Sequence, residues 1–144
     1  MKPLFSSSYL DSLFASCDYG KLIELSGLIY GSPAYHSDIP NYGLPVPAFI
    51  FVESLLWFAQ AIRSGTWTYF EATPVARQEA MRSGLERMAP AAYAMNFTLG
   101  MRNWQDPERM DQVDRWIEAH EEENTHWLWR MVNEHRSEIQ ALFA

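Results

Sequence analysis

Cysteine is almost absent from this sequence, and its scarcity limits where the chain can work. Cys17 is the one thiol among 144 residues, so no disulfide can form within the chain. Small secreted domains commonly depend on disulfides, whereas a reducing compartment keeps thiols free. We therefore expect a cytoplasmic protein.

Basic residues are few, and they form no cluster. The chain has 11 Lys and Arg against 18 Asp and Glu, a formal net charge of −7. Residues 104–144 hold four basic and ten acidic side chains, whereas residues 1–103 hold seven and eight. Nucleic-acid binding needs clustered Lys and Arg to contact phosphates. We therefore expect no direct binding to nucleic acid, and a basic protein as the partner.

Long uninterrupted hydrophobic runs are also missing. The most apolar stretch, residues 48–62, is interrupted by Glu53, Ser54 and Gln60. A membrane-spanning helix needs about 20 consecutive, predominantly apolar residues. We therefore expect no membrane-spanning segment and no membrane partner.

Apolar residues are nevertheless abundant, at 48% of the chain with 15% aromatic, which argues against disorder. Their spacing follows helical periodicity, and Pro or Gly separates the periodic segments. We predict a single all-α domain over residues 1–144 with six to seven helices, and one short extended segment near 66–70 at most. The expected helices cover residues 9–16, 21–30, 48–64, 74–88, 91–103, 106–119 and 126–142, the last two being either separate or continuous.

The longest irregular stretch, residues 31–47, contains four prolines together with Tyr35, His36 and Tyr42. Irregular segments of this length are uncommon in compact domains and are often functional. One reading makes these side chains a partner-binding loop. The other makes the segment a connection that its aromatic side chains fix to the core, and the sequence leaves both open.

An acidic helix face is the first candidate site. Met110, Val113 and Ile117 have the spacing of one buried helix stripe. Carboxylates on the opposite side would lie about 5.4 Å apart along the axis, one turn from each other. Such a row could imitate nucleic-acid phosphates, although the same pattern also describes an ordinary solvated face. Five carboxylates recur at three- and four-residue steps and are predicted to share this face: Asp111, Asp114, Glu118, Glu121 and Glu122.

Two further features could carry chemistry. Glu53 lies inside an apolar helix, where a carboxylate needs a partner or reaches water, and we expect a structural role rather than an acid in a pocket. His120 and His126 are six residues apart, unlike the two His at i and i+4 of a metalloprotease helix. Glu122 and His126 do have that spacing and could form a weak metal site. We assign no catalytic residue, no metal ligand and no cofactor.

A resemblance covers residues 48–90. Gly65, Tyr69 and Phe70 match in kind a turn of the pattern N-G-G-F-x-Q-F-F-x-N, while both Asn, one Gly and the Gln of that pattern are replaced here. In this respect the segment resembles a family of small, acidic, helical bacterial proteins that includes a homodimeric DNA mimic. The resemblance implies a bacterial, helical interaction protein, a homodimer, and a Gly65 that permits a left-handed cap while Tyr69 and Phe70 fix the turn to the core.

We therefore predict a non-catalytic interaction protein whose acidic C-terminal helices bind a basic protein, in the manner of a DNA mimic. The first alternative is an immunity or antitoxin protein that neutralises a toxin, and the second is a metal-dependent enzyme, so the question of catalysis stays open. The predicted partner-binding residues are Asp111, Asp114, Glu118, Glu121, Glu122, Tyr35, His36 and Tyr42.

Overall fold

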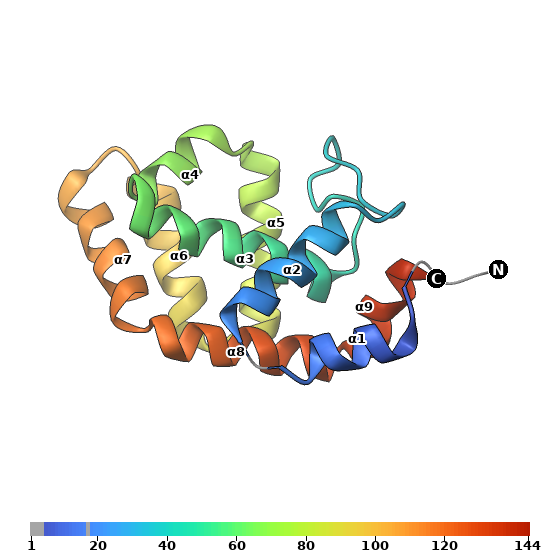
Figure 1. Ribbon diagram of the computed structural model, residues 1–144. Helices are drawn as coiled ribbons and strands as arrows, with labels where there is room; N and C mark the ends of the chain where they lie inside the picture. Colours follow the sequence, from blue (N-terminus) through green and yellow to red (C-terminus); the bar gives the residue numbers. More distant parts are fainter. Residues whose placement is uncertain (1–4, 17) are drawn as a thin grey trace. The chain divides into compact units, whose positions relative to one another are not determined.

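The computed structural model describes residues 5–16 and 18–144, so Cys17 lies outside the described residues (Figure 1). This part of the chain contains helices and no strand, which confirms the all-α prediction. The predicted number of helices is wrong, because the described residues form nine α-helices and one 3₁₀ turn. They are α1 Ser7–Phe14, α2 Tyr19–Tyr30, α3 Val46–Arg63, α4 Trp67–Ala72, α5 Val75–Met88, α6 Ala91–Asn103, α7 Pro107–Ala119, α8 Glu121–Glu134, α9 Arg136–Gln140 and η1 Ala141–Phe143.

The chain separates into two compact units. The first unit contains residues 1–52 and 122–144, and the second contains residues 53–121. The boundaries fall within α3 and at the start of α8, so the first unit holds the first turns of α3 and nearly all of α8. The prediction of one domain stays a prediction.

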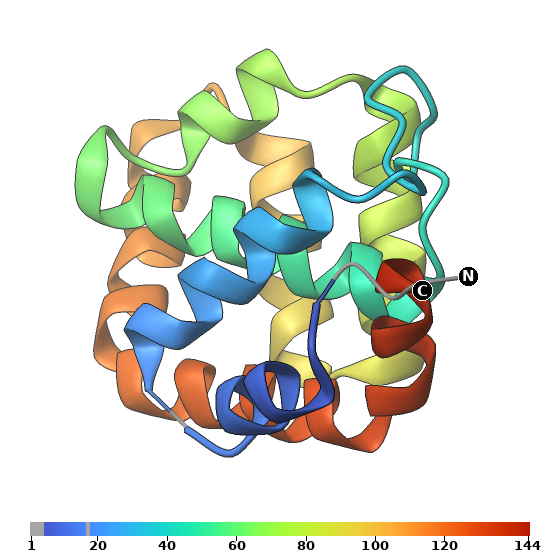
Figure 2. The same cartoon turned by 45° about the vertical axis from the view of Figure 1, so that its right-hand side comes forward.

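In the first unit, polar contacts join α1 and α2 to α8 and α9. The Trp129 indole N–H donates to the carbonyl oxygen of Asp18 at 3.1 Å, and the Asn133 amide donates to that of Phe14 at 3.3 Å. Arg136 forms an ion pair with Asp11. Figure 2 follows the chain from α2 through the irregular segment into α3. These bonds tie segments more than a hundred residues apart into one unit.

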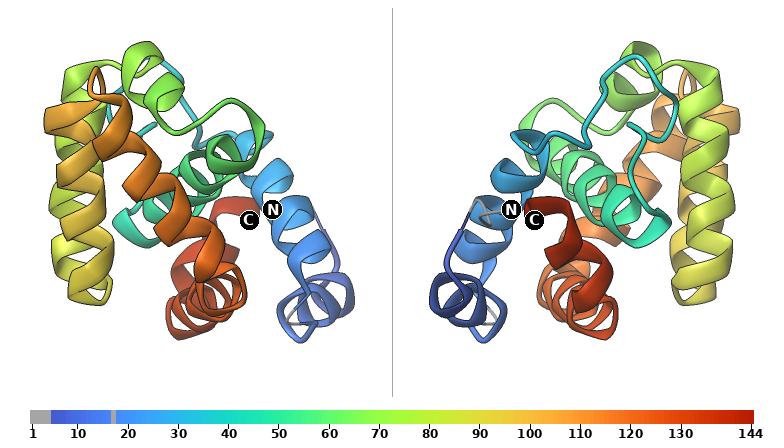
Figure 3. Two further views of the ribbon diagram at one scale, coloured as in Figure 1. Left: turned by 90° about the vertical axis from the view of Figure 1, so that its left-hand side faces the viewer. Right: turned by 90° about the vertical axis from the view of Figure 1, so that its right-hand side faces the viewer.

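The second unit is organised around α6, which lies between α5 and α7 (Figures 1 and 3). Trp57 of α3 and Phe97 of α6 are both fully buried, with ring centroids 5.2 Å apart at 81°. Phe70 of α4 packs on Phe97 and reaches the backbone of α6 at Gly100. This aromatic core holds α4 and α7 in place around α6.

Thr66 is the N-cap of α4 and residues 67–70 lie within α4, so the predicted extended segment is wrong. Tyr69 and Phe70 are both buried, whereas successive side chains of a strand point to opposite faces. Adjacent residues of a helix are about 100° apart, so both rings can reach one core. Gly65 has a φ of 94°, and its N–H bonds to the carbonyl oxygen of Gln60 at 2.7 Å, which closes α3 before α4 begins. The left-handed cap and the buried rings expected from residues 48–90 are thus present.

The last predicted helix, residues 126–142, is also wrong in its bounds. α8 begins at Glu121, and Asn124 is a buried residue inside it. α8 ends at Glu134, because His135 leaves helical geometry with φ −113° and ψ 27°, and a separate α9 follows. This division and the additional α4 account for the two helices that the sequence did not predict.

α3 is long and apolar enough to cross a membrane by length and composition alone. However, 67% of that 18-residue window is buried inside the fold. Burial of this kind is typical of a central core helix, which passes the same test.

Candidate functional site

The exposed side of α7 carries part of the predicted acidic face. Met110, Val113 and Ile117 are buried, as their spacing predicts, which leaves Asp111 and Glu118 exposed on the helix. The Asp111 carboxylate pairs with Arg115 one turn later at 2.9 Å, with both side chains largely exposed. Glu118 has no ion pair among the described residues. α7 therefore presents exposed negative charge that its own cations offset only in part.

The five predicted carboxylates do not share one helix face, so that prediction is wrong. α7 ends at Ala119, since the His120 N–H bonds to the carbonyl oxygen of Ile117 and leaves helical geometry with φ −115° and ψ 23°. The His120 ring places Nδ1 2.7 Å from the carbonyl oxygen of Trp116, which the N–H of residue 120 would bond in a continuing helix. Glu121 and Glu122 consequently start α8, and both are exposed.

Asp114 is only partly exposed, because it is bonded within the fold. Its Oδ1 accepts the backbone N–H of Thr66 at 2.9 Å and the Thr66 hydroxyl at 2.5 Å. Thr66 is fully buried, so this carboxylate satisfies two polar groups that cannot reach water. No local pattern in the sequence indicates this pairing, because the two residues are 48 positions apart.

A cleft of about 550 Å³ lies beside Asp114, between the α3–α4 turn and the start of α7. It brings together two tryptophans and two of the predicted carboxylates. Trp67 is 39% exposed and Trp104 is half-buried. Neither tryptophan is among the predicted site residues, although six tryptophans in a small chain already suggest that some lie at the surface. We name this site the Trp cleft; it is lined by Ser64, Gly65, Trp67, Trp104, Gln105, Pro107, Met110, Asp111 and Asp114.

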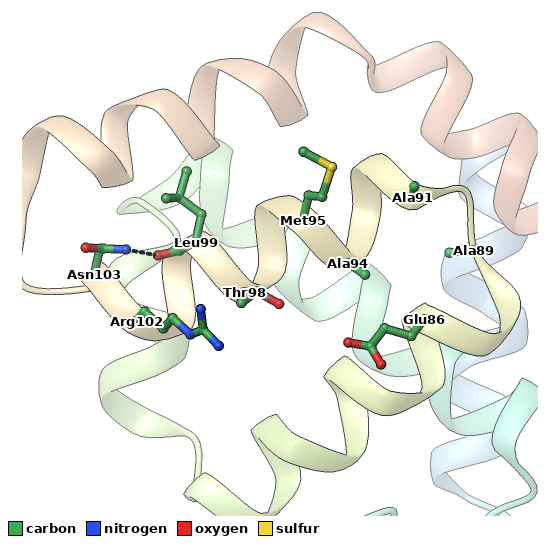
Figure 4. Close-up of a pocket in the computed structure, with 9 residues that line it drawn as sticks. All are labelled: Glu86, Ala89, Ala91, Ala94, Met95, Thr98, Leu99, Arg102 and Asn103. Atoms are coloured by element: carbon green, nitrogen blue, oxygen red, sulfur yellow. Dashed lines mark hydrogen bonds between the residues drawn. The ribbon is translucent and has the colours of Figure 1, made fainter.

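A second groove, of about 610 Å³, lies along α5 and α6 (Figure 4). Its apolar lining consists of three alanines with Met95 and Leu99, and Met95 is 69% exposed. Glu86 and Arg102 project toward it from α5 and α6 (Figure 4). Glu86 is already paired with Arg82 at 2.8 Å. The groove offers apolar surface and no arrangement of reactive groups.

The irregular segment, residues 31–45, is held by aromatic packing. Tyr42 is buried and lies against Tyr35, Tyr30 and Phe49, with ring centroids 4.9, 6.2 and 5.6 Å away. This arrangement matches the second reading, in which the segment is a connection fixed to the core. Three residues of this segment are predicted to bind a partner. Of these, His36 is exposed, Tyr35 is half-buried and Tyr42 belongs to the core.

Glu53 is completely buried, and its Oε2 accepts the Tyr69 hydroxyl at 2.5 Å. A buried carboxylate costs free energy unless it is hydrogen-bonded, and this bond supplies a partner from α4. The geometry therefore agrees with the structural role expected for Glu53.

Within residues 5–16 and 18–144, no group of three or more His, Cys, Asp or Glu is placed to hold a metal ion. His120 is bonded to its own helix end, and His126 is exposed. No protein-family model, no curated protein and no solved structure matches this chain.

Proposed function

We propose that this protein works by binding a basic partner protein in the bacterial cytoplasm, in the manner of a DNA mimic. The proposed contacts are individual exposed carboxylates, Glu118 in the second unit and Glu122 in the first, each of which attracts a basic surface by itself. The observation that carries the proposal is the charge of residues 104–144, which contain ten acidic and four basic side chains.

Exposed carboxylates are suited to recognising a basic surface. Glu118 and Glu122 are exposed, and neither forms an ion pair among the described residues. Their attraction to a positive surface accelerates association and weakens as salt screens it, over a distance of about 8 Å at physiological ionic strength. A complex formed in this way is therefore expected to be strongly salt-sensitive.

The test is charge reversal at positions that do not support the fold. Full-length protein is used to capture partners from the cells of origin, and captured proteins are identified by mass spectrometry. The salt dependence of the purified complex is then measured by calorimetry. Glu118→Lys combined with Glu122→Lys is expected to weaken binding at least about tenfold, because two attractions become repulsions.

The matched control reverses two exposed carboxylates elsewhere, Asp38→Lys with Glu71→Lys, which changes the net charge by the same amount. This control is expected to bind within about twofold of the wild type, since exposed charges act locally at physiological salt. Equal losses in both double variants, or no basic protein captured by the wild type, would refute the proposal. Capture of a basic toxin would identify the immunity or antitoxin alternative.

A further inference from the structure

We infer that the Trp cleft receives an arginine side chain of the basic partner, and this inference rests on the proposed function. The cleft combines indole rings that stack on no other described ring with a carboxylate that Thr66 holds in place.

The two tryptophans of the cleft differ from those of the core. Trp57 and Trp116 pack against each other and against further rings, and the Trp129 N–H is hydrogen-bonded. Trp67 and Trp104 form no ring contact and no side-chain hydrogen bond with any described residue. Both indole rings are thus partly exposed and unstacked, and partly exposed tryptophans are enriched at recognition surfaces.

The carboxylate of Asp114 is held in place with one oxygen uncommitted. Both bonds from Thr66 end on Oδ1, and Oδ2 has no donor and no cation among the described residues. The two bonds fix the orientation of the group, so a ligand that binds Oδ2 does not have to order it. Asp111 adds a second negative charge to the lining of the cleft, which its ion pair with Arg115 offsets in part.

Gly65 brings the indole and the carboxylate together. A Cβ added to Gly65 would lie 2.9 Å from Cδ1 of Trp67 and 3.3 Å from Oδ2 of Asp114. The edge of the Trp67 ring and Oδ2 of Asp114 therefore both lie close to Gly65. A group that enters the cleft can contact an aromatic surface and a carboxylate at the same time.

The guanidinium group of arginine fits this combination. It is planar and weakly hydrated, stacks on indole rings, and presents five N–H donors to carboxylate oxygens. The lysine ammonium is a compact, strongly hydrated charge that does not stack. Anionic ligands are opposed by Asp111 and Asp114. Charge complementarity with a basic partner thus selects an arginine side chain as the occupant.

The test uses the full-length protein and the capped peptide acetyl-Gly-Arg-Gly-amide, with binding followed by the indole N–H signals in NMR spectra. The signals of Trp67 and Trp104 are expected to move in a saturable manner with a millimolar Kd, while those of the other tryptophans stay in place. The corresponding lysine peptide is expected to bind about fivefold more weakly. If neither indole signal responds to the arginine peptide, the inference is wrong.

Two variants and one control separate the cleft from general acidity. Trp67→Ala and Asp114→Asn are each expected to weaken the arginine peptide about tenfold, since the first removes a stacking surface and the second a charge. In Asp114→Asn the side-chain amide oxygen still accepts from Thr66, and an unchanged Thr66 amide signal verifies the fold. Asp38→Asn removes the same charge at an exposed position outside the cleft and is expected to act within about twofold. Equal weakening by Asp114→Asn and Asp38→Asn would overturn the inference.

The inference and the proposed function fail in different ways. If a basic partner is captured and Glu118→Lys with Glu122→Lys releases it, but Trp67→Ala does not weaken it, the function stands and the inference fails. If the arginine peptide fills the cleft but no basic partner is captured, the cleft chemistry is supported and the proposed function fails. Loss of partner binding in both sets of variants supports both.

Discussion

Gly100 of α6 lies directly against the Phe70 ring of α4. A Cβ there would lie 2.5 and 2.8 Å from Cε2 and Cζ of Phe70, and 3.3 Å from Cε of Met110. Optimal carbon–carbon contacts are about 3.5–4.0 Å, so Gly100→Ala forces the buried ring or α6 to move. Overpacking of this kind costs about 1–3 kcal/mol, against a gain of about 1 kcal/mol in helix propensity. The difference is a net loss of about 0–2 kcal/mol in the free energy of unfolding, and the 2.5 Å contact places the expected value in the upper half of that range, at about 1–2 kcal/mol.

The assay is urea unfolding followed by circular dichroism. With a slope of about 1–3 kcal/mol per molar urea, a loss of about 1.5 kcal/mol lowers the midpoint by roughly 0.5–1.5 M. Gly27→Ala is the matched control, since it lies inside α2 and a Cβ there would meet nothing within 4 Å. That substitution is expected to stabilise the protein by about 0.5–1 kcal/mol.

The two Gly→Ala changes are thus expected to have opposite signs. Phe70→Leu removes the ring atoms that the new methyl group would meet, so Gly100→Ala should cost less in that background, with a coupling of about 1 kcal/mol. The reasoning is refuted if Gly100→Ala is as stable as the wild type, or if its cost is the same in the Phe70→Leu background.

Two further changes test single hydrogen bonds. The Tyr9 hydroxyl donates to Glu24 at 2.7 Å, and this bond, followed by that from Lys21, lowers the pKa of Glu24; Tyr9→Phe should therefore raise that pKa in an NMR titration. A lowered carboxyl pKa stabilises the fold above the pKa of the unfolded chain, and this stabilisation is lost as pH falls through the folded pKa. The Tyr9→Phe variant should therefore be less stable than the wild type at neutral pH and equally stable in acid. An unchanged pKa of Glu24 would contradict this. Thr66→Val keeps the shape of the side chain but removes the hydroxyl bond to Asp114, and should cost about 1.5–3 kcal/mol in urea unfolding, the range for bonds to charged groups. Thr66→Ser keeps the hydroxyl and should retain most of the stability that Thr66→Val loses. A Thr66→Val variant as stable as the wild type would show that the bond contributes nothing.

Helix bounds could be predicted where local chemistry sets them. Asp106 followed by Pro107 predicts the start of α7, and Asp106 Oδ1 accepts the backbone N–H groups of Glu108 and Arg109 at 3.1 and 3.4 Å. Ser6 likewise caps α1 through the N–H of Tyr9 at 3.2 Å. These signals act within one turn of helix, so they are visible in the sequence without knowledge of the fold.

The prediction failed where a distant contact decides the local structure. The aromatic run Trp67–Phe70 has strand propensity, but burial of Tyr69 and Phe70 in one core selects a helix. Tertiary packing overrides weak local preference in this segment.

In the candidate site, too, features set by local sequence could be predicted and features set by tertiary contacts could not. Charge composition alone locates the acidic region, because a count of charges needs no geometry. Assigning all its carboxylates to one face required a continuous helix, and the bond from His120 to the carbonyl oxygen of Trp116 ends α7 before Glu121. The roles within the region depend on contacts further away: Thr66 makes Asp114 part of the fold, while Glu118 remains at the surface. A charge-reversal experiment designed on sequence alone would have included Asp114, and the resulting loss of binding could have come from damage to the α3–α4 turn. Using Asp114→Asn for the cleft and reversing Glu118 and Glu122 for the surface separates recognition from folding.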